Sequence, residues 1–92
     1  MAQLEADIQR ARQTIARLKS QIAEQERLLH DMEQDASRFG VDSPGGREAR
    51  RAFEAELAKQ RQTIRALRKL LDDETRRLER LESALHGGGR VA

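Results

Sequence analysis

The chain lacks cysteine, tryptophan and tyrosine, and it has two phenylalanines and one proline among 92 residues. Without cysteine there is no disulfide, no cysteine-based zinc site and no thiol nucleophile. No apolar run reaches the roughly 18 residues that a membrane-spanning helix needs, so we expect no membrane span and a cytoplasmic location. Without tyrosine and tryptophan, the chain also has few side chains on which single-stranded nucleic acid could stack.

Charge is abundant but balanced. Charged residues make up 37% of the chain, yet 18 lysines and arginines against 16 aspartates and glutamates leave a net charge of only +2. Self-repulsion is therefore small, which argues against disorder. The richness in Ala, Glu, Leu, Arg and Gln is typical of long helices, and the Arg/Ala content favours a bacterial or phage origin.

Apolar residues recur at alternating steps of four and three along two stretches of the chain. The first stretch starts at Leu4 and the second at Phe53, and both keep a heptad phase when these two residues are placed at position d. A seven-residue repeat sustained over several heptads predicts a left-handed coiled-coil seam. The apolar residues of the stripe are Leu4, Ile8, Ala11, Ile15, Leu18, Ile22, Leu29, Met32, Ala36, Phe39, Phe53, Leu57, Ile64, Leu67, Leu71, Leu78, Leu81 and Leu85.

Between the two stretches the residues change to helix-ending types. Gly40 suits the position just past a helix end, and Ser43 with Pro44 suits a helix start. The sequence predicts a helix over about 2–39, a turn over 40–46, a second helix over about 44–86 and a flexible tail over 87–92. The predicted fold is all-α, an antiparallel coiled-coil helical hairpin.

Two registers of this hairpin compete. A turn centred near Pro44 makes the stripes end flush, with Leu18 opposite Leu71. In the alternative register, shifted by one heptad, we expect three ion pairs across the seam: Arg12 with Glu82, Glu26 with Arg68 and Glu33 with Arg61. Exposed ion pairs contribute about 0.2–1 kcal/mol each, less than the loss of flush apolar layers, so we predict the flush register.

In the flush register Leu28 and Leu70 have no apolar partner within the chain, and two helices alone leave their seam open on one side. A second hairpin would cover it, so we predict a homodimer that forms a four-helix bundle. In shape this resembles the antiparallel helical hairpins that dimerise into such bundles, a plasmid copy-number RNA-binding regulator among them; shape alone does not assign a function. The predicted self-association residues are Leu28, Leu29, Leu70, Leu71, Ile15, Ile22, Ile64 and Leu67.

Polar residues interrupt the stripe at d positions, and two of them, Gln25 and Glu74, correspond under an internal repeat in which residues 12–15 recur as residues 61–64. Their long side chains either extend from the seam to solvent or control register, since a buried polar group penalises shifted assemblies. Both interpretations remain open at the level of sequence.

Catalysis finds little support in the sequence. His30 and His86 sit at outward positions on different helices, and no Glu-x-x-His pair faces the seam, which argues against a di-iron bundle. Asp72, Asp73 and Glu74 are consecutive, so they fan around the helix instead of converging. We expect no enzyme activity, no cofactor and no metal.

Two functions therefore remain, and we expect a protein-interaction module, meaning an adaptor, scaffold or small regulator with an unidentified protein partner. The alternative is a nucleic-acid-binding regulator, because the interval 59–69 contains no acidic residue. The candidate contacts for a partner or nucleic acid are Lys59, Arg61, Arg65, Arg68, Lys69, Phe39 and Val41.

Overall fold

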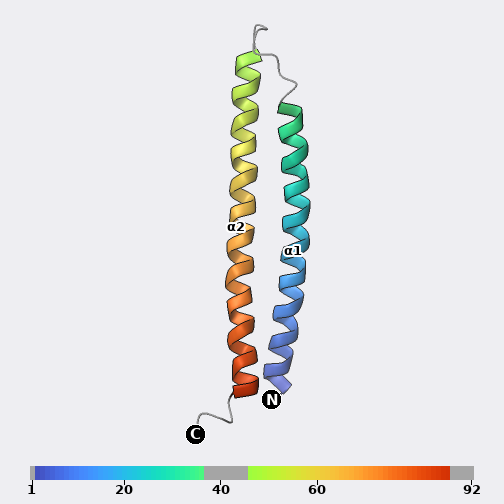
Figure 1. Cartoon of the computed structure of the whole chain (residues 1–92), viewed down its shortest axis with the longest axis vertical. Helices are drawn as coiled ribbons and strands as arrows, with labels where there is room; N and C mark the ends of the chain where they lie inside the picture. Colours follow the sequence, from blue (N-terminus) through green and yellow to red (C-terminus); the bar gives the residue numbers. More distant parts are fainter. Residues whose placement is uncertain (1, 37–45, 88–92) are drawn as a thin grey trace.

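The chain folds into two long helices that run antiparallel, side by side (Figure 1). A computed structural model describes residues 2–36 and 46–87. Helix α1 spans Ala2–Ala36 and helix α2 spans Gly46–Gly87, with no strand in either of these ranges. The predicted all-α hairpin is confirmed.

Two predicted helix bounds fall in the described ranges. Helix α1 begins at the predicted residue, and α2 ends at Gly87, one residue beyond the predicted end. Acidic Glu5 and Glu48 occupy the first turns of the two helices, where the helix dipole favours negative charge. The predicted end of the first helix at 39, the start of the second at 44, and residues 88–92 of the predicted tail lie outside the described residues.

The core is a single seam between the helices. Its buried residues all occupy a or d positions of the heptads: Ile8, Ala11, Leu18, Ile22, Leu57 and Ile64. The other large apolar residues of the stripe in the described ranges are only partly buried. The period of 3.5 residues thus identified the face along which each helix contacts the other. Two helices alone bury only part of the apolar side chains on that face.

The register is flush at the open end, where the start of α1 lies beside the end of α2 (Figure 1). In the same register Arg12 bonds Glu82 at 2.8 Å, Arg61 bonds Glu33 at 2.9 Å, and Arg68 pairs with Glu26. The expectation that these pairs require a shifted register was wrong. Their backbones are offset by about five residues, and helical side chains lean toward their own N-terminus, so in antiparallel helices the two partners lean toward each other.

The molecule is a rod of 73 × 19 × 14 Å with a radius of gyration of 20.8 Å. A compact domain of this length has a radius of gyration of about 12 Å. The rod exposes 7116 Å² of surface, whereas a compact monomer of this mass exposes about 5,400 Å². The chain is therefore far more extended than a compact domain of its length.

Candidate interaction surfaces

The seam divides the surface of the hairpin into two different sides. One, which we call the paired side, carries the ion pairs that cross between the helices. Its residues at heptad position e form those bonds: Arg12, Glu26, Glu33, Arg61, Arg68 and Glu82. Because these charges satisfy one another within the chain, the paired side supports the hairpin register and offers few free charges to a ligand.

The opposite side, which we call the leucine side, consists of the residues at positions g and c of both helices. Leu28 and Leu70 are its large apolar residues and are 47% and 55% exposed. Around them lie the uncharged, exposed Gln21, Thr63 and Ala66. The Thr63 hydroxyl donates to the Lys59 carbonyl at 3.1 Å, so its hydrogen-bonding need is met within the helix. Charged residues are close by on the same side, since Glu24 and Asp31 flank Leu28 and Asp73 follows Leu70 by one turn, so this region combines apolar and charged groups.

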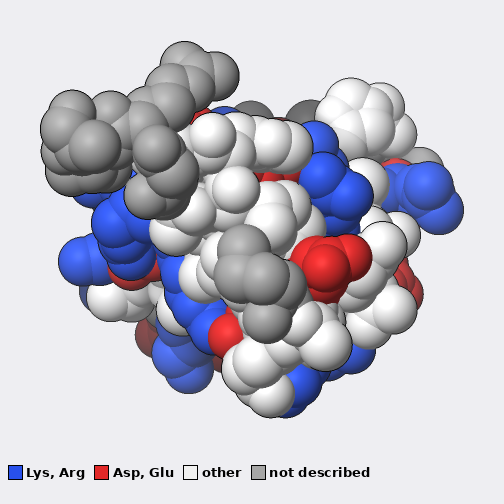
Figure 2. Space-filling view, turned by 90° about the horizontal axis from the view of Figure 1, so that it is seen from below, with Lys and Arg blue, Asp and Glu red and all other residues white. Residues whose placement is uncertain are grey.

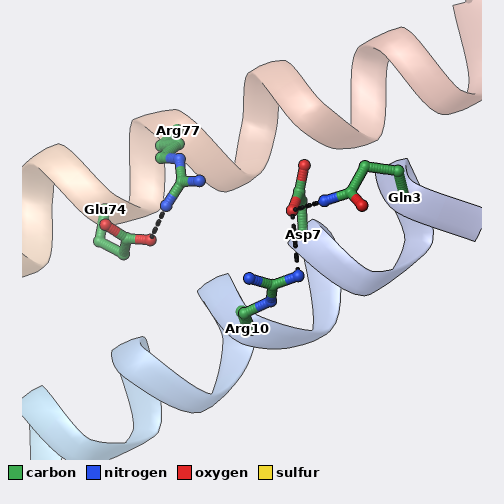
Figure 3. A network of polar contacts seen from close by, with 5 residues as sticks. All are labelled: Gln3, Asp7, Arg10, Glu74 and Arg77. Atoms are coloured by element: carbon green, nitrogen blue, oxygen red, sulfur yellow. Dashed lines mark hydrogen bonds and ion pairs between the residues drawn. The ribbon is translucent and has the colours of Figure 1, made fainter.

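Toward the open end the leucine side becomes charged. Asp7 accepts a hydrogen bond from Gln3 at 2.9 Å and lies 3.7 Å from Arg10, while Arg77 bonds Glu74 at 3.1 Å (Figure 3). Each of these contacts stays within one helix, and Figure 3 draws none between α1 and α2. The charges here are thus held locally and do not fix the hairpin register.

The polar seam residues behave differently from one another. The Gln60 amide donates to the Gln25 side-chain oxygen at 2.6 Å and to the Gln25 backbone carbonyl at 3.0 Å, across the half-buried seam. Glu74 instead reaches the seam edge, where Arg77 meets it. The sequence pattern indicated Gln25 and Glu74 but not Gln60 as the partner of Gln25, although Gln60 also occupies a d position of the stripe.

The predicted self-association residues fall in three classes of exposure. Ile22 and Ile64 are buried in the hairpin itself. Partly buried are Leu29, Leu71, Ile15 and Leu67. Leu28 and Leu70 are exposed and lie on the leucine side.

The predicted basic contact residues are partly neutralised. Arg61 and Arg68 bond Glu33 and Glu26, and Lys59 lies 3.5 Å from Glu56. Only Arg65 and Lys69 of this cluster have no ion pair within the described ranges. A shallow groove beside Arg65 is bounded by Glu26, so an acidic residue lies at its edge. Viewed from the open end, basic side chains occur on opposite flanks with acidic ones among them (Figure 2). Phe39 and Val41 lie outside the described residues.

The residues that sequence analysis considered for chemistry stay apart. His30 contacts Gln34 at 3.2 Å on α1, and His86 lies near the end of α2. Asp72 bonds Arg76 at 3.0 Å, as its helical spacing suggests. The described part of the chain contains no group of three or more histidines, aspartates or glutamates placed to hold a metal ion. Neither α1 nor α2 is long and apolar enough to cross a membrane.

Comparison with known proteins yields no match to a family model, a curated protein or a solved structure.

Proposed function

We propose that this chain is a non-enzymatic protein-interaction module that works by self-association, the homodimer being its basic unit. The observation that carries the proposal is the exposure of Leu28 and Leu70 on one side of a rod whose own core is a single seam. Monomeric proteins expose scattered apolar residues, but here two large exposed leucines lie on the same side of an elongated rod. A second hairpin on that side would complete a four-helix bundle.

Nucleic-acid binding is the weaker candidate. Its support is the absence of acidic residues within 59–69, and the carboxylates of Glu26, Glu33 and Glu56 oppose that support by pairing with the cluster. Phosphate groups would have to displace these carboxylates from the lysine and arginines of the cluster. We therefore place protein interaction first.

Replacing Leu70 by Glu tests the proposal. We expect the wild-type chain to sediment as a dimer at micromolar concentration, and Leu70→Glu to sediment as a monomer with lower helicity, because a charge buried in an apolar interface is costly. The matched control is Ala58→Glu, which adds the same charge to α2 at an exposed position on the paired side. We expect it to remain dimeric.

Two results would contradict the proposal. A wild-type chain that stays monomeric across the micromolar range removes self-association as the function. A Leu70→Glu dimer as stable as the wild type leaves self-association standing but moves it away from the leucine side.

A further inference from the structure

The charges of the leucine side are unevenly divided along the rod. In the open half, next to Ala2 and Gly87, basic residues outnumber acidic ones: Arg10, Arg17, Arg77 and Arg80 against Asp7 and Asp73. In the other half, next to residues 37–45, acidic residues outnumber basic ones: Glu24, Asp31, Asp35 and Glu56 against Lys59. Each half of this side thus has the opposite charge from the other.

The exposed leucines lie at the boundary between the two halves. In the flush register Leu70 of α2 lies level with Lys19 of α1, so Leu28 and Leu70 are about 13 Å apart along the rod at 1.5 Å per residue. Their midpoint is close to the centre of the hairpin. A two-fold axis through that midpoint leaves the apolar patch facing a copy of itself.

We propose that a second copy of this chain docks on the leucine side in the antiparallel orientation, so that the open half of each copy covers the acidic half of the other. This inference rests on the proposed self-association and names its surface and geometry. The two-fold axis crosses the rod, so α1 packs on α1 of the second copy and α2 on α2. The interface is isologous, as expected for a homodimer.

Most facing charges then have opposite signs; the exception is Glu24, which lies close to the two-fold axis and faces Glu24 of the second copy. Arg17 meets Asp31 of the second copy and Arg10 meets Asp35, while on the other helix Asp73 meets Lys59 and Arg77 meets Glu56. Each pair occurs twice by symmetry. In the parallel orientation α1 would pack on α2 of the second copy. That arrangement places Arg17 beside Asp73 and Asp31 beside Lys59, which attract, but also Arg10 beside Arg80 and Asp35 beside Glu56, which repel. The antiparallel dimer has more attractive and fewer repulsive contacts, so charge complementarity favours it.

The long face of the rod is large enough for a specific dimer. A standard interface buries about 800 Å² on each partner, and the rod extends 73 × 19 Å along its two longest principal axes. The paired side is a poorer surface for the second copy because its charges already bond across the seam.

Charge reversal with rescue tests the facing pair. Arg17 and Asp31 are exposed, and no ion pair within the described ranges holds either of them. In sedimentation equilibrium we expect Arg17→Asp to weaken the dimer about ten-fold, since the lost contact occurs twice, and Arg17→Asp/Asp31→Arg to return it to within about three-fold of the wild type. Arg27→Asp, a reversal at an exposed position on the back of α1, should change the affinity by about two-fold at most.

Distances between spin labels test the orientation. The chain has no cysteine, so a single introduced cysteine carries the only label. In the antiparallel dimer, labels at Ser83→Cys lie at opposite ends of the bundle, about 50 Å apart at 1.5 Å per residue, while labels at Gln62→Cys near the centre are separated along the rod by only about 10 Å. Both positions are exposed and point away from the leucine side.

The outcomes separate this inference from the proposed function. A dimer in which the Ser83 labels are as close as the Gln62 labels is parallel, and it overturns the inference while self-association stands. The antiparallel inference is also overturned if Arg17→Asp leaves the dimer affinity unchanged. It is overturned as well if adding Asp31→Arg to Arg17→Asp does not restore that affinity. A chain that remains monomeric overturns both.

Discussion

The hydrogen-bonded residues Gln25 and Gln60 illustrate how a single polar contact shapes an apolar seam. Two amides at d positions meet because the flush register brings them within reach, and each lies at the half-buried edge of the contact. A shifted register would separate them and leave both amides facing apolar side chains, which costs free energy. The pair therefore favours one alignment of the helices.

Replacing Gln60 by Leu should lower the free energy of unfolding by about 1 kcal/mol, because Gln25 loses its donor while remaining partly buried. The double change Gln25→Leu/Gln60→Leu should recover this loss or exceed it, since an apolar pair of similar size replaces the polar one. Urea unfolding at one protein concentration measures the difference. A double variant that is less stable than the single one would contradict this account.

At the scale of the helices, the ion pairs of the paired side join α1 to α2 along most of their length. They are exposed, with Arg12 and Glu82 side chains 53% and 36% accessible. Each such pair contributes only a few tenths of a kcal/mol to about 1 kcal/mol. Their role is to support a register that the apolar seam already favours.

Glu82→Gln should lower the free energy of unfolding by about 0.2–1 kcal/mol, and less at high salt, because it removes the charge that bonds Arg12. Glu79→Gln, one turn away on the same helix and outside the ion pairs that cross the seam, is the matched control and should change stability little. A double-mutant cycle with Arg12→Gln isolates the pair. Equal effects of the two single changes would show that the cross-helix contact contributes nothing.

At the scale of the whole molecule, the rod has two sides of different character, and this difference distinguishes the two candidate functions. A protein interface belongs on the leucine side. A nucleic acid would instead have to contact the basic residues of 59–69, several of which bond carboxylates.

The triple change Arg61→Gln/Arg65→Gln/Arg68→Gln tests the nucleic-acid alternative. We expect no binding of duplex or single-stranded probes by the wild type at 0.15 M salt, and a loss of stability of about 0.2–1 kcal/mol for each of the two broken ion pairs. Binding at that salt, falling with a slope of about −0.7 to −0.9 per phosphate and abolished by the triple change, would favour the nucleic-acid function. Sedimentation of the same variant should still show a dimer.

The sequence by itself determined the helices and the face along which they meet. Leu18, Ile22 and Ile64 repeat with the heptad, and a periodic pattern is a local property that each helix carries without its neighbour. It also marked Leu28 and Leu70 as apolar residues outside the stripe. What it did not determine is how flanking residues meet, because that depends on the direction in which side chains lean from two antiparallel backbones.

Only the tertiary structure decided that flush helix ends and the Arg12–Glu82, Glu26–Arg68 and Glu33–Arg61 pairs coexist. The structure also showed that Gln60 donates a hydrogen bond to Gln25 across the seam, whereas Glu74 forms an ion pair with Arg77 on its own helix. The physical reason is the same in each case: a contact between helices needs their axial offset and the reach of each side chain, and neither quantity is contained in the spacing of residues along one helix.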